Sequence, residues 1–269
     1  MRIALFLLTA ALACAQTAKV PFSQHMLRVT EYTQQQNETV VQKFQGLRLT
    51  DVVDALDEIG LQDITVMDHG IKPLWRDEQK FTHRVYGVAV TVRLVPAQER
   101  APIFLNREDY YKWKTAWTQK YPRYKQAGFL TKDTILVMEV PQGRDVGQCG
   151  SENSYGWFLK GMRGIVTEGG CRDTDELILE RVPVYERAET RGVYHGRVIA
   201  ESWNAPVTVG GVLVMPNDVI VADGNGVAVV PRKVADEVVG RAHKVQDADK
   251  PARLKHYRKA SRPPDFTVK

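Results

Sequence analysis

Cysteine is scarce in this chain of 269 residues, which contains only Cys14, Cys149 and Cys171. So few cysteines exclude a disulfide scaffold of the kind that supports small exported domains, although Cys149 and Cys171 could form one bridge. A strong excess of one charge is also missing. The formal net charge is only +5, and basic residues are dense only between 250 and 259. The charge pattern therefore gives little support to nucleic-acid binding.

The signatures of several common enzyme classes are absent as well. None of the six histidines has the HExxH spacing of zinc proteases, and the GxSxG motif of serine hydrolases does not occur. The glycines of "DGNGV" (223–227) precede a predicted strand rather than a helix, so this segment predicts a turn and not a nucleotide or S-adenosylmethionine site. We also interpret the Asp68-His69 pair as part of a turn.

Long apolar runs are limited to the N-terminus. Residues 1–15, "MRIALFLLTAALACA", have a basic start, an apolar centre and small residues at the end. This pattern is typical of a secretory signal peptide, and it predicts cleavage before Gln16. The run is too short for a comfortable membrane span. We predict an exported protein, periplasmic or secreted. A lipoprotein acylated at Cys14, or a retained N-terminal anchor, is the alternative.

The remaining sequence has the pattern of an α/β protein, in which strands, glycine turns and helices alternate. "LRLTDVVDALDEIG" (47–60) predicts a helix with Thr50 as its N-cap and Gly60 at its end. Apolar and β-branched runs predict further elements. These are strands at 86–95, 132–140 and 164–167, and a helix at 150–162.

The C-terminal part changes to a β pattern. After Pro206 the sequence predicts three strands, with turns at 216–217 and 223–226, and then a closing helix over 232–245. We find no internal repeat and no linker. The predicted organisation is a signal peptide (1–15), an N-terminal arm (16–45) with helical spacing at Met26, Val29 and Tyr32, one α/β domain (46–245) and a basic C-terminal tail (246–269).

The segment 107–129 is unusually aromatic, with Trp113, Trp117 and several tyrosines among lysines. We favour an amphipathic helix that lies on the core. A lid, a lipid-facing patch and a partner surface are the alternatives.

The segment "TEGGCRDTDEL" (167–177) places Arg172 and three carboxylates directly after a predicted strand and two glycines. The preceding helix begins at 150–153, where its free N–H groups could bind a carboxylate. In a strand-helix-strand unit, the start of the helix and the end of the next strand can lie on the same rim of the sheet. The two segments would then combine amide donors, a guanidinium for a carboxylate or enolate, and a carboxylate for a hard cation.

Several blocks of this sequence, in order, resemble the family that joins the regulator of ribonuclease activity A (RraA-like proteins) to the class II pyruvate aldolases of 4-hydroxy-4-methyl-2-oxoglutarate. The resemblance covers about residues 47–232, and "GGCRDTDE" fits the family's Arg-Asp-x-x-Glu/Asp motif. The other blocks are "LTDVVDALDEIG", "GVAVTV", "TILVMEV", Gly150 about twenty residues before the turn, "VPVYER" and "PVTVGGVLVMPNDVIVADGNGVAVVP". The resemblance implies a single-domain α/β sandwich of the swivelling β/β/α type, assembled as a homotrimer or homohexamer with sites at subunit interfaces.

Carried over by position, the resemblance also implies a site. Asp173 would bind Mg²⁺, Mn²⁺ or another divalent cation, Arg172 would hold the keto or enolate oxygen, and Glu176 would orient metal-bound waters. These three are the expected catalytic residues. The pyruvate carboxylate would be received by the backbone at Gly150, Ser151, Glu152 and Asn153.

The implied function is a divalent-metal-dependent lyase that cleaves a 2-oxo acid and releases pyruvate, by a retro-aldol reaction or by decarboxylation of oxaloacetate. Two other functions stay open, namely a regulator of a ribonuclease complex and an exported binding protein that kept the fold without the reaction. After Gly150 the family usually continues with apolar residues, whereas this chain reads Ser-Glu-Asn-Ser (151–154), so the substrate itself is not predicted.

The two remaining cysteines stand next to the predicted site, since Cys149 precedes Gly150 and Cys171 precedes Arg172. If both segments line one pocket, the sulfurs lie near each other. A bridge would close a loop of about twenty residues and could contribute about 3 kcal/mol to stability. Small buried cysteines are also common core residues, and we favour two free, buried thiols.

Overall fold

A computed structural model describes residues 26–124 and 127–269. The predicted signal peptide, its cleavage site and Cys14 lie outside the described residues, so export and lipidation stay predictions. Among the described residues, no helix combines the length and the apolar character needed to cross a bilayer.

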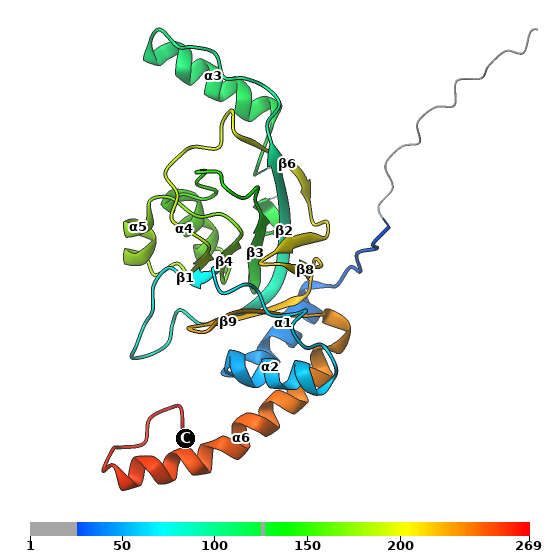
Figure 1. Cartoon of the computed structure of the whole chain (residues 1–269), viewed down its shortest axis with the longest axis vertical. Coiled ribbons are helices and arrows are strands. Elements are labelled where there is room, and N and C mark those ends of the chain that lie inside the picture. The colour runs from blue at the N-terminus through cyan, green and yellow to red at the C-terminus, as the bar shows by residue number, and fades with distance from the viewer. Residues whose placement is uncertain (1–25, 125–126) are drawn as a thin grey trace, which may run out of the picture.

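The protein has the expected mixed α/β architecture, with one large sheet and helices on its outer faces (Figure 1). The helices are α1 (Gln34–Phe44), α2 (Leu49–Glu58), α3 (Arg107–Lys120), α4 (Ser151–Leu159), α5 (Thr174–Leu179) and α6 (Ala235–Lys259), with 3-10 turns at Ala127–Phe129 and Arg232–Val234. The strands are β1 (Lys72–Pro73), β2 (Val85–Pro96), β3 (Thr134–Glu139), β4 (Gly164–Thr167), β5 (Val184–Glu186), β6 (Val198–Trp203), β7 (Val207–Val209), β8 (Val212–Val214), β9 (Val219–Asp223) and β10 (Gly226–Val230).

The large sheet curls into a nearly closed barrel. Its strand order is β1-β5-β4-β3-β2-β9-β10, and β6 pairs with the far half of β2. Strands β2 to β5 are parallel. The segment before β1 joins the two edges, since Met67 donates to the carbonyl of Val227 on β10 (3.0 Å) and Lys72 pairs with Glu186 on β5. Closure of this kind leaves few unpaired strand edges.

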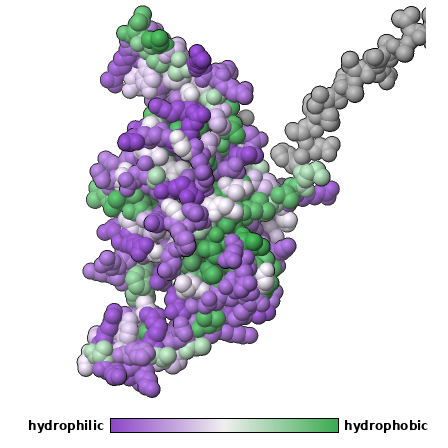
Figure 2. Space-filling model, viewed as in Figure 1, coloured by the Kyte–Doolittle hydropathy of each residue, from purple (hydrophilic) through white to green (hydrophobic). Residues whose placement is uncertain are grey.

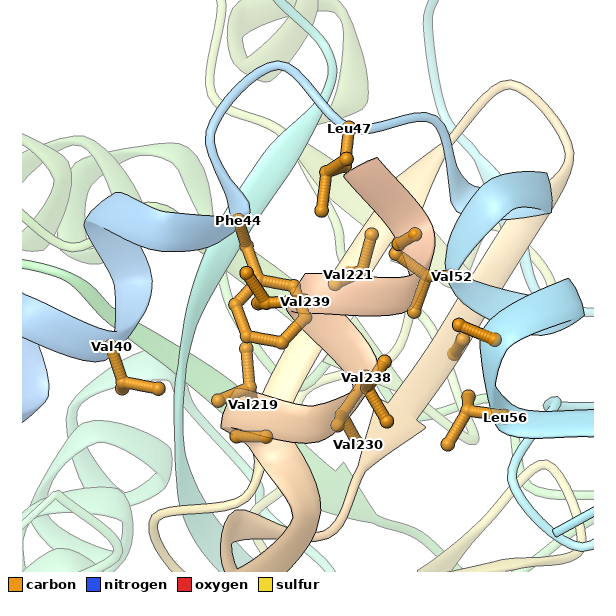
Figure 3. Packing of buried hydrophobic residues seen from close by; sticks show 14 of the residues in the cluster. Val40, Phe44, Leu47, Val52, Leu56, Val219, Val221, Val230, Val238 and Val239 are labelled. Atoms are coloured by element: carbon orange, nitrogen blue, oxygen red, sulfur yellow. The ribbon is translucent and has the colours of Figure 1, made fainter. Parts of the chain in front are cut away.

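The core has three parts, one inside the barrel and two on its outer surface. Along β2, Ala89 faces the barrel interior, whereas Val88 and Val90 face outward. The outer parts differ in their position along the strand, since Val88 packs with α1, α2 and α6, and Val90 packs with α4 and α5. The hairpin β7-β8 contributes its valines to the interior. Figure 3 shows the first part, where Phe44 of α1 and Val238 of α6 pack over β9 and β10.

The N-terminal arm is a structural part of the domain rather than an appendage. Its helical stretch is α1, which begins after a capping box formed by Thr33 and Gln36, whereas the predicted helical spacing from Met26 to Tyr32 lies in non-helical chain. Val40 and Phe44 of α1 are buried in the core.

Two predictions of secondary structure were wrong, each for an identifiable reason. Helix α2 begins at Leu49 and not after Thr50, because the distant carboxylate of Asp223 accepts a hydrogen bond from the Leu49 N–H (3.1 Å) and so caps the helix. Four strands, not three, follow Pro206. Gly210 and Gly211 both have positive φ (58° and 77°) and form a tight turn between β7 and β8.

Helix α6 is much longer than the closing helix predicted for 232–245. It continues to Lys259 with Pro251 inside it, so more than half of the predicted basic tail is helical. Helix α3 is the other large departure. It projects from the body of the molecule instead of lying on the core (Figure 1), and Trp117 is its only buried residue. Hydrophobic residues lie at the far end of this projection (Figure 2). In the segment just before α3, Ile103 and Leu105 are each 93% exposed.

Candidate functional site

The candidate site lies where the parallel strands β3 and β4 end. The loop after β3 leads to α4 through Gly147, and the chain after β4 passes Gly170 on its way to α5; the two glycines form a parallel bridge. The N–H of Gln148 donates to the carbonyl of Gly170 (2.8 Å), and the N–H of Arg172 donates to the carbonyl of Cys149 (2.9 Å). The two segments that the sequence predicts to share a rim are therefore in direct contact.

Two glycines allow this close approach. A Cβ atom at Gly147 would lie 2.8 Å from Cγ of Arg172, and one at Gly150 would lie 2.5 Å from Oδ2 of Asp173. Both separations are shorter than real Cβ contacts. Gly150 is also the N-cap of α4, so the absence of a side chain brings the Asp173 carboxylate to the amide end of this helix.

Asp173 stands at the N-cap of α5 in the left-handed conformation (φ 60°, ψ 45°), which aspartate tolerates better than most residues. Among the residues that the structure describes, its two carboxylate oxygens make only long contacts. Oδ1 lies 3.4 Å from Nε of Arg172, and Oδ2 accepts from the N–H of Ser151 at 3.4 Å. Both side chains of the Arg172-Asp173 pair are more than a third exposed. The carboxylate therefore keeps lone pairs that can bind a ligand.

The other predicted site residues lie around this pair. Glu176 is exposed in the first turn of α5, one turn beyond Asp173. Glu152 is exposed in the first turn of α4, and its Oε2 accepts from the side-chain amide of Asn153 (3.2 Å). The structure thus collects all seven residues on one rim, while their catalytic and binding roles stay predictions.

The residues at this site fit a water-rich divalent cation better than a cage of protein ligands. In the part of the chain that the structure describes, no group of three or more His, Cys, Asp or Glu side chains could hold a metal ion. Mg²⁺ is commonly bound through one or two carboxylates with water completing its shell. The open carboxylate of Asp173 suits that mode, and it is the residue that would hold the ion.

Glu186, at the end of β5, is a buried carboxylate behind the site that the sequence analysis did not single out. Its Oε2 accepts from the N–H of Cys171 (2.6 Å), and Oε1 has no hydrogen-bond partner among the described residues. Burial raises the pKa of Glu186 to about 7. The block "VPVYER" contains this residue, but a glutamate in a strand gives no sequence signal of burial.

Both segments that the sequence analysis interpreted as turns, the Asp68-His69 pair and "DGNGV" (223–227), do form turns. Asp68 accepts from the N–H of Gly70 (2.8 Å) and binds Arg187, which accounts for the Asp68-His69 pair. In "DGNGV", the Asp223 side chain accepts from the N–H of Asn225 (2.8 Å) in the β9-β10 hairpin. Neither segment presents the start of a helix to a ligand.

With this geometry in place, comparison with known proteins becomes informative. The family described as RraA-like (Aldolase/RraA) matches residues 49–229. The chain belongs to the RraA-like family. This family includes class II aldolases as well as regulators of ribonuclease activity, so membership confirms the fold and leaves the activity to be tested.

Individual relatives are distant. Protein DlpA of Legionella pneumophila is 24% identical over 206 residues, which are 75% of this chain but only 29% of DlpA. A protein named as a putative 4-hydroxy-4-methyl-2-oxoglutarate aldolase of Halalkalibacterium halodurans is 34% identical over 89 residues, 33% of this chain and 42% of that protein. The structure of Streptomyces coelicolor RraAS2, described as an unusual member of the RNase ES inhibitor RraA protein family, superimposes with a TM-score of 0.62 at 23% identity, over 80% of this chain and 96% of RraAS2.

Proposed function

We propose that this RraA-like protein is a divalent-metal-dependent lyase that cleaves a 2-oxo acid and releases pyruvate. The observation that carries the proposal is the junction at the rim, where the amide end of α4, the Arg172 guanidinium and the open Asp173 carboxylate meet within hydrogen-bonding range. The partial match to a putative aldolase supports the same reaction class.

The chemistry follows from what each group can do. A cation held by Asp173 would supply Lewis-acid stabilisation of the negative charge that develops on the keto oxygen. Arg172 places a planar pair of donors beside that oxygen, which favours the enolate over the neutral ketone. The free N–H groups at the start of α4 hold the carboxylate of the 2-oxo acid and so orient the bond that breaks. Glu176 would accept hydrogen bonds from water near that cation.

Two features favour the alternative, an exported binding or regulatory protein that kept the RraA-like fold. The Asp173 carboxylate itself occupies part of the amide end of α4 through the Ser151 N–H, where it would compete with a substrate carboxylate. The segment after Gly150 is also polar, with Glu152 exposed. An assembly as homotrimer or homohexamer belongs to the same proposal, because the site lies on an open rim that a second subunit could complete.

The deciding experiment is a coupled assay of pyruvate release from purified protein. 4-Hydroxy-4-methyl-2-oxoglutarate, oxaloacetate and other 2-oxo acids are each tested with Mg²⁺, with Mn²⁺ and with a chelator. If any of these 2-oxo acids yields pyruvate in a reaction that depends on the cation, the lyase function is supported. Binding of a 2-oxo acid without turnover under all conditions supports the binding protein instead.

A further inference from the structure

Cys149 and Cys171 form a pair of thiols directly behind the candidate site. Both are free in the structure, and both side chains are completely buried. Both side chains belong to the apolar cluster under α4 and α5. Met138 of β3 contacts Cys149, with its sulfur 3.7 Å from Sγ of Cys149. The two thiols therefore point into the same apolar cluster and not to opposite sides of the sheet.

The backbone around the pair is held at strand spacing. One hydrogen bond joins Gln148 to Gly170 (2.8 Å), and a second joins Arg172 to Cys149 (2.9 Å), so the residues on both sides of Cys171 are bonded to the segment that contains Cys149. Neighbouring strands are about 4.8 Å apart. Disulfides join residues whose Cα atoms are about 4.4–6.8 Å apart. A bridge here needs rotation of side chains and no separation of the two segments.

We infer that Cys149 and Cys171 are a site of covalent modification, at which a small disulfide oxidant such as oxidised glutathione joins the two sulfurs. The two S–H bonds and the S–S bond of the oxidant break, one S–S bond forms in the protein, and the oxidant leaves as two thiols that carry the two protons. Because both sulfurs are buried, the bond forms while the chain folds or when this region opens.

The bond has a structural consequence that follows from its position. It closes the loop that contains α4 and β4, and it ties the residue before the amide end of α4 to the residue before Arg172. Oxidation therefore fixes the two halves of the candidate site relative to each other. Any effect on turnover rests on the proposed lyase function, whereas the bond itself does not.

The test uses the full chain, unfolded and then refolded in buffers of oxidised or reduced glutathione. After refolding with oxidised glutathione, we expect the intact protein to lose two hydrogen atoms and a digest to contain one peptide pair linked through Cys149 and Cys171. The oxidised form should melt about 5–10 °C above the reduced form. Reductant should reverse both changes.

Cys149→Ala and Cys171→Ala are matched controls, since each removes one small buried thiol and leaves the other without its partner. Neither variant should show the linked peptide or a melting temperature that depends on the redox buffer. A wild-type protein that refolds with both thiols free, or that links either cysteine to Cys14 instead, overturns the inference. So does a linked protein whose melting temperature equals that of the reduced form.

The readouts separate this inference from the proposed function. Mass, peptide mapping and melting temperature do not need a substrate. If the protein forms the bridge but releases no pyruvate, the modification site is supported and the lyase proposal is contradicted. If it releases pyruvate but forms no bridge, the lyase proposal is supported and the modification site is contradicted.

Discussion

Two charged clusters share the rim where the parallel strands end, and they are built in opposite ways. In the closed cluster, the buried Glu168 accepts from Arg187 (2.8 and 2.9 Å), from the side chain of Gln142 (2.9 Å) and from the N–H of Gly210 (2.5 Å). In the open cluster, Arg172 and Asp173 are partly exposed and their contacts are 3.4 Å long.

The comparison distinguishes charged groups that stabilise the fold from charged groups that are available to bind a ligand. A buried carboxylate whose oxygens all have donors has little capacity left for a ligand. Glu168 thus ties the β4 end to β7-β8 and to Arg187. The open pair has unused lone pairs and donors and little of the local structure depends on it. Glu186 is intermediate, because it is buried like Glu168 but, within the described part of the chain, only one of its oxygens is hydrogen-bonded.

The largest effect is expected for Asp173→Asn. If the open cluster is catalytic, this variant should lose pyruvate release by on the order of 100- to 1,000-fold at limiting Mg²⁺, because it removes the charge of the one protein ligand for the cation. The melting temperature should stay the same as in wild type, since asparagine also tolerates the left-handed conformation. Asp175→Asn, two residues further along, is the matched control. Near-normal turnover of the Asp173 variant would contradict the assignment of Asp173 as the ligand of the cation.

Glu168→Ala tests the closed cluster. We expect a loss of about 3 kcal/mol in the free energy of unfolding, because the buried part of Arg187 and the Gly210 N–H lose their acceptor. Urea denaturation measures it, with the exposed Glu189→Ala on the same rim as control. If the two variants are equally stable, the closed cluster is not structural and the comparison fails.

Glu186→Gln should change the pH dependence of stability. Since the folded pKa of about 7 lies above the ordinary value of 4.5, the folded state binds more protons than the unfolded state between these pH values. Wild-type stability should therefore fall by roughly 2–3 kcal/mol from this group as pH rises from 4.5 to 7, and then level off. Denaturant melts at a series of pH values should show this slope in wild type and in the control Glu201→Gln, which changes an exposed glutamate of β6. The same slope in Glu186→Gln would assign the proton to another group.

Arg172→Lys is expected to have the smallest of these effects. The charge remains, but a lysine ammonium cannot reproduce the planar donor fork beside a keto acid, so kcat/KM should fall about 10- to 100-fold. Steady-state kinetics of pyruvate release measure the change, and Arg191→Lys, on the exposed part of the rim, is the control. Equal kcat/KM in wild type and the Arg172 variant would exclude Arg172 from the site.

Much of the fold could be predicted because the relevant signals are local. The β-branched run at 86–95 and the glycine turn after Thr167 are typical of strands that end at a rim, and the structure has both. The meeting of the α4 start with Arg172 and Asp173 follows from strand-helix-strand connectivity, which needs no knowledge of distant residues.

The errors occurred where distant residues decide. Whether α3 lies on the core depends on which surface is left for it, and the aromatic pattern of 107–129 is compatible with both arrangements. Similarly, α1 is part of the core because α6, two hundred residues later, packs on the same strands. Neither packing partner leaves a trace in the local sequence.

The amino-acid sequence determined the strands, the glycines at the rim and the order of Arg172 and Asp173, because these depend on side-chain size, backbone freedom and spacing along the chain. Only the tertiary structure decided which charges are usable. Asp173, Glu168 and Glu186 are all acidic residues that follow or end a strand. Folding gives each of them different neighbours. Asp173 stays open to solvent, both oxygens of Glu168 are hydrogen-bonded, and Glu186 is buried with one oxygen that has no partner among residues 26–124 and 127–269.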